Sequence, residues 1–538
     1  MSLLSIEGLH LAINGQPVLR DVSLRVARGE VLGVIGESGS GKSMCAFSVM
    51  QLLPRGAACS GVVRLDGVDV LQAGERQLNG IRGRMVGMVF QEPMTALNPL
   101  QSIGDQVAET VRLHEGLSRR AAMQRAREAL AKAELPEAEF ALSRYPHELS
   151  GGQRQRVVIA MAIACGPALL IADEPTTALD VTTQAEILNL LKRLVREEGC
   201  GLVLISHDLA VVAGMADRIA IMRAGEVVEQ GETGQILHHM RHDYSRALLA
   251  ASAHQPERGA VTGDEVLLRC RDVVRDYALP RGGLFAAQQH FRAVDGVSFD
   301  IRRGESLGLV GESGCGKSTL TRAILGLEPL QGGRIDIKGQ AIAAGAGLHP
   351  ELRKHMQVVF QDPYGSFNPR HPVERLICEP FHLWDDPPVG AARDRAIAEA
   401  LEAVGLSVAD RHKYPHEFSG GQRQRIAIAR ALITRPDLII LDEAVSALDV
   451  SVRAQVLDLL ADLQGRLGLT YLFISHDLSV VRAITDRVLV MKGGRIVEEG
   501  ATGAVFDAPA HPYTAALIAA APKLPQGLSE VSGANTGG

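Results

Sequence analysis

A nine-residue, glycine-rich stretch occurs twice, as GESGSGKSM from Gly36 to Met44 and as GESGCGKST from Gly311 to Thr319. Both copies fit the pattern G-x-x-x-x-G-K-[ST]. Glycines let backbone N–H groups close around phosphate oxygens, the lysine reaches the terminal phosphates, and the next hydroxyl binds Mg²⁺. Each stretch follows a short apolar run, VLGVIG or SLGLVG, which predicts a strand leading into the loop. We therefore expect two phosphate-binding loops.

Acidic residues and histidines stand at the ends of other apolar runs. LLIAD ends at Asp173 and LIILD ends at Asp442, and a glutamate follows each of them, Glu174 and Glu443. Aspartates at strand ends can hold Mg²⁺, usually through water, and a carboxylate one residue further on can orient or deprotonate an attacking water. His207 and His476 each follow the acidic pair by the same interval and also end apolar runs, which favours contact with a γ-phosphate.

The whole motif set is repeated. LSGGQRQR at Leu149–Arg156 returns as FSGGQRQR at Phe418–Arg425, and the segments around Asp173 and His207 return 269 residues later. The lysines of the two loops, Lys42 and Lys317, are instead 275 residues apart. The first copy is therefore longer between its lysine and its SGGQ motif, and we expect the extra residues in surface loops.

The elements that must position these residues are predicted to be strands buried on both faces, alternating with helices. GLVLIS and TYLFIS are continuous apolar runs, residues 118–135 have a helical pattern, and residues 157–172 read as a helix end, a turn and a buried strand. This predicts the α/β class with a mainly parallel sheet in each copy. The expected organisation is a domain at 1–250, a linker at 251–264, a second domain at 265–525 and a disordered tail at 526–538.

Composition limits the other possibilities. The 538 residues are 46% hydrophobic and 22% charged, with a net charge of −6, which argues mildly against a whole-protein affinity for nucleic acid. The seven cysteines are scattered and are expected to be free thiols. The N-terminus is a poor signal peptide, and no apolar run has the roughly 20 residues of a membrane span. A role in transport would therefore need partner subunits for the pore.

Taken together, SGGQ, the glycine-rich loop, the strand-end DE pair and the strand-end histidine resemble the ATP-binding subunits of ABC transporters. The resemblance covers both halves of the chain. VFQEPMTALNP at Val89–Pro99, VFQDPYGSFNP at Val359–Pro369 and HPYT at His511–Thr514 resemble the peptide and nickel importer branch. The two ATPases of that branch are often separate chains, whereas here they are fused. The resemblance implies two P-loop domains, each with a helical subdomain and an antiparallel β edge.

The family implies that two such domains sandwich two ATP molecules head to tail. The nucleotide contacts would come from Gly36, Glu37, Ser38, Gly39, Ser40, Gly41, Lys42, Ser43, Met44, Gln91, Ser150, Gly151, Gly152 and Gln153 of the first copy. Those of the second copy would be Gly311, Glu312, Ser313, Gly314, Cys315, Gly316, Lys317, Ser318, Thr319, Gln361, Ser419, Gly420, Gly421 and Gln422.

The resemblance also assigns roles within each ATP site. Each loop would face the SGGQ motif of the other copy. The catalytic residues would be Glu174, His207, Glu443 and His476, and Mg²⁺ would be held by Ser43, Gln91, Asp173, Ser318, Gln361 and Asp442. Gln91 and Gln361 would sense the γ-phosphate and Mg²⁺, and the loops after them would dock the membrane subunits. Asp180 and Asp449 would be the loop aspartates at the contact between domains.

Some positions depart from the family pattern. An aromatic residue usually stacks on adenine early in each domain, but the first copy has Ile13 there, and Tyr277 is the best candidate in the second. Met44 replaces the hydroxyl that Thr319 could offer to an α-phosphate, so the first loop is expected to bind ATP more weakly. Ser40 and Cys315 are expected to be filler, because the loop acts there through its backbone. Between His242 and the second glycine-rich loop the only cysteine is Cys270, which predicts no iron–sulfur centre.

The expected partners are two membrane permease subunits and a solute-binding protein, with the chain peripheral to the cytoplasmic face of the inner membrane and no nucleic-acid partner. The expected function is an ATPase that drives the import of peptides or related solutes. Glutathione, short peptides, nickel chelates and antibiotic peptides all remain open. A ribosome-associated twin-ATPase is the main alternative, but such proteins carry a long charged linker. A DNA-repair ATPase would carry zinc-binding cysteine pairs.

Overall fold

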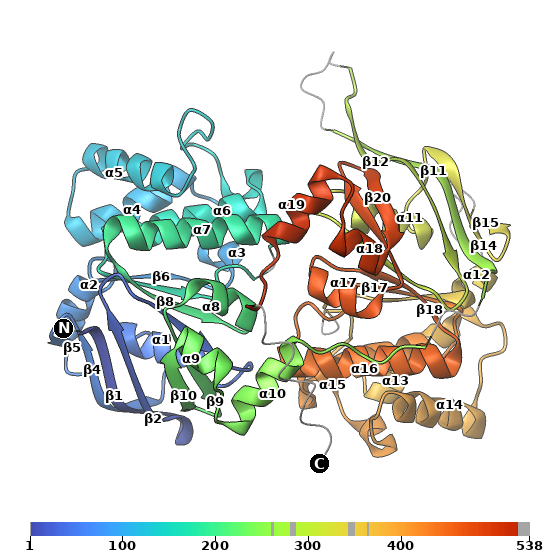
Figure 1. Cartoon of the computed structure of the whole chain (residues 1–538), viewed down its shortest axis with the longest axis horizontal. Helices are drawn as coiled ribbons and strands as arrows, with labels where there is room; N and C mark the ends of the chain where they lie inside the picture. Colours follow the sequence, from blue (N-terminus) through green and yellow to red (C-terminus); the bar gives the residue numbers. More distant parts are fainter. Residues whose placement is uncertain are drawn as a thin grey trace. The chain divides into compact units, whose positions relative to one another are not determined.

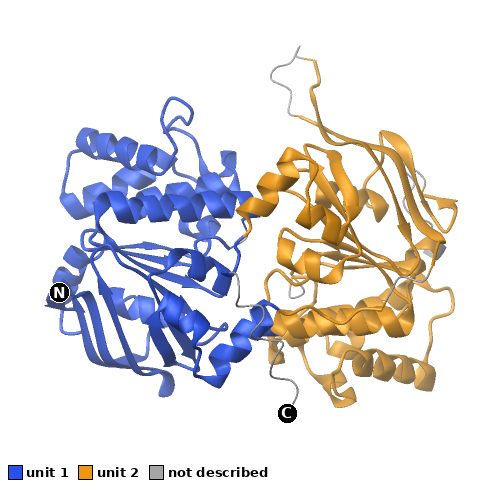
Figure 2. Ribbon diagram, viewed as in Figure 1, with its two compact units in different colours: residues 1–253, 449–451, 522–538 blue, residues 254–448, 452–521 orange. Residues whose placement is uncertain are grey.

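The computed structural model describes residues 2–177, 179–259, 263–279, 287–342, 350–362 and 365–525. It divides into two compact units, shown in different colours in Figure 2. Unit 1 comprises residues 1–253, 449–451 and 522–538, and unit 2 comprises residues 254–448 and 452–521. The first copy of the motif set lies in unit 1, and the second copy lies in unit 2 except for Asp449 and Val450. Each unit has two sheets and a group of helices (Figure 1).

Unit 1 opens with an antiparallel sheet. Its first two strands form a hairpin whose two-residue loop, Asn14 and Gly15, has positive φ angles of 50° and 80°. Asn-Gly suits this turn because both residues tolerate the left-handed conformation that a tight hairpin needs. The strand order is β2-β1-β4-β5. The strands are β1 (Ser2–Ile13), β2 (Gln16–Ala27), β4 (Ala57–Leu65) and β5 (Val68–Asp69).

The second sheet of unit 1 has six strands in the order β10-β9-β3-β8-β7-β6. All neighbouring strands are parallel except β9 and β10, which are antiparallel. Every residue of β3, β7 and β8 is buried, as their continuous apolar sequences predict. The strands are β3 (Val31–Ile35), β6 (Val86–Val89), β7 (Leu169–Asp173), β8 (Gly201–Ser206), β9 (Arg218–Arg223) and β10 (Glu226–Glu232). The prediction of a mainly parallel sheet is therefore confirmed.

The helices of unit 1 begin and end where the sequence signals them. Ser118 caps the helix predicted over 118–135, because its hydroxyl accepts a hydrogen bond from the Ala121 N–H. The predicted helix end, turn and strand over 157–172 are also present, with Gly166 at φ 62° in the turn. The helices are α1 (Lys42–Met50), α2 (Glu75–Ile81), α3 (Pro93–Ala96), α4 (Ile103–Glu115), α5 (Arg119–Lys132), α6 (Gly151–Ile163), α7 (Val181–Glu198), α8 (Leu209–Met215), α9 (Thr233–His238) and α10 (Asp243–Ser252).

Three of these helices, α4, α5 and α6, pack on one another and form a helical subdomain (Figure 1). Their buried faces carry small and branched apolar residues, among them Val107, Val111, Ala126 and Val157. Small side chains such as alanine allow close approach of the helices, and the buried apolar area stabilises the group. The helical subdomain positions the start of α6, where the SGGQ motif lies.

Unit 2 repeats this architecture. Its four-stranded sheet has the order β12-β11-β14-β15 and its six-stranded sheet the order β16-β17-β18-β13-β19-β20. The strands are β11 (Val266–Ala278), β12 (His290–Arg302), β13 (Ser306–Val310), β14 (Gly332–Ile337), β15 (Gln340–Ala341), β16 (Met356–Val359), β17 (Leu438–Asp442), β18 (Thr470–Ile474), β19 (Arg487–Lys492) and β20 (Arg495–Ala501). The helices are α11 (Lys317–Ile324), α12 (Pro350–His355), α13 (Val373–Ile377), α14 (Gly390–Ala403), α15 (Gly420–Leu432), α16 (Val450–Leu467), α17 (Leu478–Ile484), α18 (Thr502–Asp507) and α19 (Pro512–Ala520).

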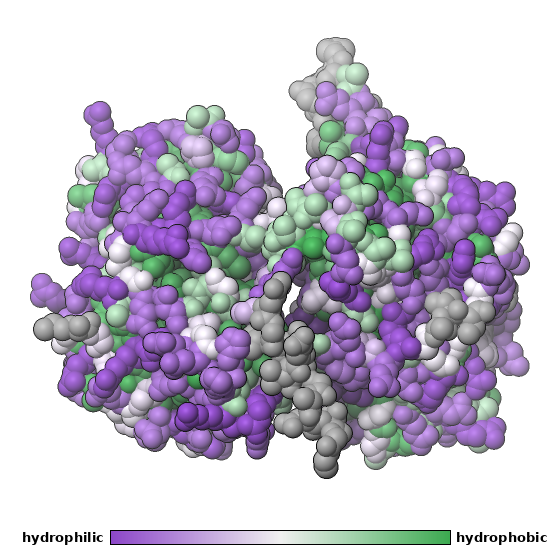
Figure 3. Space-filling view, in the orientation of Figure 1, coloured by the Kyte–Doolittle hydropathy of each residue, from purple (hydrophilic) through white to green (hydrophobic). Residues whose placement is uncertain are grey.

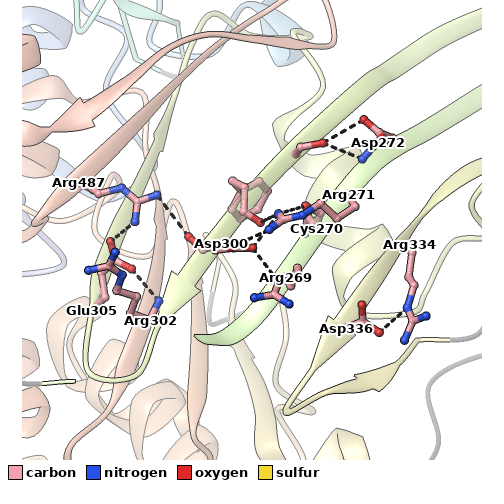
Figure 4. A network of polar contacts seen from close by, with 12 residues as sticks. Arg269, Cys270, Arg271, Asp272, Asp300, Arg302, Glu305, Arg334, Asp336 and Arg487 are labelled. Carbon is pink, nitrogen blue, oxygen red and sulfur yellow. Dashed lines mark hydrogen bonds and ion pairs between the residues drawn. The ribbon is translucent and has the colours of Figure 1, made fainter. Parts of the chain in front are cut away.

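A polar network connects the two sheets of unit 2 (Figure 4). Arg487 of β19 donates to the Glu305 carboxylate at 2.6 Å and to the Asp300 carbonyl at 3.3 Å. The Asp300 carboxylate in turn accepts from Arg271 of β11 at 2.8 Å. Burial tends to raise the pKa of Asp300, but the hydrogen bonds and charges of Arg271 and Arg269 together outweigh it, so the pKa lies below its usual value. The Asp300 carboxylate therefore stays charged and bonds Arg271 within the antiparallel sheet, while the Asp300 carbonyl links this sheet to Arg487 of the parallel one.

Hydrophilic residues predominate on the face of the molecule in Figure 3, with apolar residues scattered among them. Among the helices that the structure describes, none combines the length and the hydropathy that crossing a bilayer requires.

Candidate functional site

The phosphate loop of unit 1 connects β3 to α1. Two of its glycines have no room for a side chain: a Cβ on Gly36 would lie 2.2 Å from the Met222 carbonyl, and one on Gly41, at φ 100°, would lie 2.6 Å from a Leu19 methyl. The loop can therefore pass close to its neighbours only because these residues are glycines. The Lys42 ammonium donates to the Gly36 carbonyl at 2.7 Å and to the Glu37 carbonyl at 2.8 Å.

The second loop has the same geometry between β13 and α11. The Lys317 ammonium donates to the Gly311 carbonyl at 2.6 Å and to the Glu312 carbonyl at 2.8 Å. The residues that differ between the loops, Ser40 and Cys315, are both buried, and both face the lysine. The Lys42 ammonium lies 3.5 Å from the Ser40 hydroxyl, and the Lys317 ammonium lies 3.8 Å from the Cys315 sulfur.

An acidic cluster lies at the carboxyl ends of β7 and β8 in unit 1. Glu174 follows β7 and accepts hydrogen bonds from Gln91 at 2.9 Å and from the Thr177 hydroxyl at 3.1 Å, and His207 lies 3.3 Å away. The parallel strands bring these residues together because their carboxyl ends share one edge of the sheet. Glu174 has a positive φ of 46°, which is uncommon for a non-glycine residue and is often found at functional sites.

The electrostatics separate the two acids of unit 1. Burial raises the pKa of Asp173 above its usual value, although a bond with the Ser43 hydroxyl and the Lys42 charge oppose this. Burial also acts on Glu174, but the hydrogen bonds from His207 and Thr177 and the charges of His207 and Lys42 together outweigh it, so the pKa of Glu174 is lowered. Glu174 is therefore a carboxylate at neutral pH. Burial lowers the pKa of Lys42, and the nearby Glu174 charge partly restores it.

Asp173 offers a place for a cation. Its Oδ1 atom is buried and has no hydrogen-bond partner in the part of the chain that the structure describes. An unpartnered buried carboxylate oxygen next to a serine hydroxyl matches the oxygen ligands that Mg²⁺ prefers. The residues present in unit 1 therefore fit a divalent cation at the edge of the phosphate loop.

Unit 2 repeats the acidic cluster at the ends of β17 and β18. Glu443 has a φ of 51°, and its carboxylate lies 3.3 Å from the His476 Nδ1 atom. Burial raises the pKa of Asp442, whereas at Glu443 the hydrogen bond with His476 and the charges of His476 and Lys317 together outweigh burial and lower the pKa. Gln361 follows β16 by two residues, as Gln91 follows β6, and both are exposed.

The SGGQ motifs lie at the start of α6 and α15. The Ser150 hydroxyl accepts from the Gln153 N–H at 3.3 Å, and the Gln153 side chain accepts from the Ser150 N–H at 2.9 Å. This reciprocal cap fixes the helix start, and Ser419 and Gln422 form the same cap in unit 2. A Cβ on Gly152 would lie 2.3 Å from Thr183, and one on Gly421 would lie 2.2 Å from Val452. Asp180 caps α7, where it accepts from the Thr183 N–H at 3.0 Å.

Tyr277 lies beside the end of the second loop. Its hydroxyl bonds the Glu328 carboxylate at 2.5 Å and lies 3.4 Å from the Thr319 hydroxyl, while the Arg275 guanidinium lies 4.5 Å from the ring centroid. In unit 1, Ile13 ends β1, and Met44 packs with Phe47 and Leu53 against the apolar core.

Sequence reasoning gave no role to several residues at these sites, namely Thr177, Arg275, Glu328, Tyr244 and Tyr513. The two tyrosines occupy matching places in the repeat, in HDYS from His242 and in HPYT from His511. The repetition of a histidine followed two residues later by a tyrosine is the signal that could have identified them. Their hydroxyls accept from the N–H groups of Glu37 and Glu312 in the phosphate loops.

Two phosphate loops, each with a strand-end carboxylate pair and an SGGQ helix start, define a protein with two nucleotide-binding ATPase cassettes. The family model described as "ABC transporter" matches residues 19–177 and 294–446, and the chain belongs to this family. A second model, described as "Oligopeptide/dipeptide transporter, C-terminal region", matches residues 228–264 and 497–536.

Curated relatives align along nearly the whole chain. The chain is 47% identical to the glutathione import ATP-binding protein GsiA of Salmonella paratyphi A, over 97% of this chain and 89% of the relative. It is also 47% identical to the protein of that name from Escherichia coli K12, over 97% of this chain and 90% of the relative. A solved ATP-binding cassette in a post-hydrolysis state, bound to ADP and Pi, covers 44% of this chain at 26% identity, with a TM-score of 0.39.

The family models and the curated relatives confirm the predicted family and fold class. They also confirm that the chain is an ATP-binding subunit and an ATPase of an ABC transporter of the oligopeptide/dipeptide class. As such a subunit it acts together with membrane permease partners.

Proposed function

We propose that the chain hydrolyses ATP at two sites and thereby powers the import of glutathione or a related short peptide. The observation that carries this proposal is the convergence of a phosphate-loop lysine, a strand-end aspartate, a strained glutamate and a histidine at one sheet edge in each unit. The names of the relatives supply the solute class, because those proteins are described as importing glutathione.

Each proposed site takes residues from both copies of the repeat. Lys42, Gln91, Asp173, Glu174 and His207 bind one ATP with Ser419, Gly421 and Gln422, and the corresponding residues of the second copy bind the other ATP with Ser150, Gly152 and Gln153. Because the γ-phosphate is then held by a helix start from the other copy, ATP closes the pair and hydrolysis releases it. Asp180 and Asp449 lie at this contact, and Tyr277 stacks on adenine at the second site.

Glu174 and Glu443 are the proposed bases. Each is ionised because the bond to its histidine lowers its pKa, so each can accept a proton from the attacking water. The lysines neutralise charge on the terminal phosphates. Ser43 with Asp173, and Ser318 with Asp442, would hold Mg²⁺, aided by Gln91 and Gln361. The ion supplies charge stabilisation to the phosphoryl oxygens when it is bound.

The partners proposed for this ATPase are two permease subunits and a solute-binding protein, at the cytoplasmic face of the inner membrane. The domain limits proposed are 1–250 and 265–525, joined by residues 251–264 and followed by residues 526–538. Co-purification with a tagged chain tests the assembly. Recovery of ribosomes or DNA instead of permeases contradicts it.

The test of the chemistry is ATP hydrolysis by Glu174→Gln and Glu443→Gln variants. Each substitution keeps the size of the side chain but removes the base, so each is expected to reduce hydrolysis at its own site by about 10²-fold or more. Glu198→Gln is the matched control, since Glu198 pairs with Lys132 on the surface. Uptake of labelled glutathione by the assembled transporter should fall in parallel. If one variant retains full activity, that site is not catalytic.

A further inference from the structure

The C-terminal helix of each unit is fixed to a strand by the same set of contacts. In unit 1 the Glu229 carboxylate on β10 accepts from the N–H groups of Arg241 and His242 at 2.8 and 3.3 Å, and His242 Nδ1 accepts from the Tyr244 N–H at 3.1 Å. In unit 2 the Glu498 carboxylate and His511 Nδ1 make the matching contacts at 2.7, 3.0 and 3.1 Å. The start of each helix is thus held in a defined position.

This position brings a tyrosine hydroxyl to each phosphate loop. The Tyr244 hydroxyl accepts from the Glu37 N–H at 3.1 Å, and the Tyr513 hydroxyl accepts from the Glu312 N–H at 3.1 Å. Both tyrosines are buried, and a cation lies over each ring: Arg223 at 5.0 Å and Lys492 at 4.6 Å from the centroids. The contact is the same, at the same distance, in two copies whose sequences differ. This indicates that the contact has a role in holding the phosphate loop.

The contact acts on the peptide that also binds the lysine. In the peptide that joins Gly36 to Glu37, the Gly36 carbonyl accepts from the Lys42 ammonium and the Glu37 N–H donates to Tyr244. To bind phosphate, the ammonium must leave the two carbonyls that it now bridges. The loop contains three glycines and has high conformational freedom, so losing the bridge leaves it with fewer constraints. The tyrosine hydroxyl bonds the loop through a different group and can keep its shape when the lysine turns to the nucleotide.

We propose that Tyr244 and Tyr513 are positioning residues for ATP, and that the C-terminal region of each unit holds the phosphate loop in its nucleotide-binding shape. The inference rests on the proposed assignment of these loops as ATP sites. It gives the oligopeptide/dipeptide transporter C-terminal region, which includes both tyrosines, a task inside the nucleotide site.

The experiment removes each hydroxyl alone in the full-length chain. Binding of a fluorescent ATP analogue is measured for Tyr244→Phe in a Lys317→Ala background and for Tyr513→Phe in a Lys42→Ala background. The lysine substitution removes binding at the other loop, so each measurement gives the affinity of a single loop. Each hydroxyl is expected to contribute about three- to ten-fold in affinity, the usual effect of one hydrogen bond. In ATP hydrolysis by otherwise unchanged chains, KM for ATP should rise by a similar factor while kcat changes less than about two-fold.

Tyr471→Phe is the matched control. Tyr471 is fully buried in unit 2, and its hydroxyl donates to the Leu460 carbonyl at 3.0 Å, away from the phosphate loop. This variant should lower the thermal unfolding temperature and leave KM unchanged. An unchanged affinity in both test variants, or an equal loss in Tyr471→Phe, overturns the inference. If the Lys42→Ala/Lys317→Ala chain still binds ATP with full affinity, the proposed loop assignment itself fails, which is a separate outcome.

Discussion

The Tyr277 hydroxyl bonds the Glu328 carboxylate at 2.5 Å and lies 3.4 Å from the Thr319 hydroxyl at the end of the second phosphate loop. The first loop ends differently. Met44 occupies the place of Thr319, and Leu53, the same distance beyond the lysine as Glu328, packs with it against the core. The second site thus has a polar edge where the first has an apolar one. The two sites differ not only at Met44 and Thr319 but also in the residues beside them, Leu53 at the first and Tyr277 with Glu328 at the second.

This difference predicts unequal ATP binding by the two loops. The Lys42→Ala chain keeps the second loop intact, and the Lys317→Ala chain keeps the first. The Lys317→Ala chain should therefore bind ATP several-fold more weakly than the Lys42→Ala chain. The reason is that the first loop lacks a hydroxyl at the α-phosphate, a contact worth about 1 kcal/mol. Calorimetric titration with ATP measures both affinities. Adding Met44→Thr to the Lys317→Ala chain should recover part of the loss, and equal affinities in the two lysine variants contradict the prediction.

A second prediction concerns Glu328. Burial tends to raise its pKa, but hydrogen bonds from Tyr277, Arg275 and Arg322 outweigh it and lower the pKa, so it holds the tyrosine as a carboxylate. Glu328→Ala should release the ring and weaken ATP binding at the second loop by about three-fold or more. The measurement uses a Lys42→Ala background. Glu399→Ala, at an exposed surface ion pair with Arg435, is the control and should leave ATP binding unchanged.

Thr177 and its counterpart Ser446 should affect the two sites unequally. The Thr177 hydroxyl donates to the Glu174 carboxylate and helps to lower its pKa, whereas the Ser446 hydroxyl donates to the Glu443 backbone carbonyl. Thr177→Ala should therefore raise the pKa of Glu174. The acid limb of the pH–rate profile should move up by about half to one pH unit, measured in a Glu443→Gln background. Ser446→Ala in a Glu174→Gln background should leave the acid limb in place.

The His476–Glu443 pair predicts a pH-dependent stability of unit 2. Burial tends to lower the pKa of His476, but the Glu443 carboxylate outweighs it, so the pKa lies above its usual 6.5. The stability that the charged histidine contributes is fully present below pH 6.5 and is lost as the pH rises through the raised pKa. The pKa of Glu443 lies below its usual 4.5. The stability that this carboxylate contributes is therefore fully present above pH 4.5 and is lost as the pH falls through the lowered pKa. The pair therefore stabilises unit 2 most between about pH 4.5 and pH 6.5.

Urea unfolding of wild type and His476→Gln tests this dependence. The variant should be less stable by about 1 kcal/mol near pH 6, and the difference should shrink towards pH 9 as the histidine of the wild type loses its charge. A difference that stays constant from pH 6 to pH 9 would mean that the pair contributes through packing rather than charge.

Much of the fold and of the candidate site was predictable because the relevant signals are local. The glycine pattern of residues 36–44 determines where a strand turns into a helix, and the apolar runs that end at Asp173 and Asp442 fix the strand ends. Parallel strands place their carboxyl ends at one edge, so Glu174 and His207 could be expected together although 32 residues separate them. The role of Thr177 was not predictable, because many hydroxyls follow strand ends without contacting a carboxylate.

The sequence by itself determined the two phosphate loops, the acidic pairs that follow the strands and the duplication, since each depends on short motifs and on the period of apolar residues. Only the tertiary structure decided that Tyr244 meets Glu37, 207 residues away, and that Glu328 holds Tyr277. Such contacts depend on where helices and strands pack in space and on the direction of single side chains, and no local pattern records either. For the same reason, only the tertiary structure decided that the edge of the first loop is apolar and that of the second is polar.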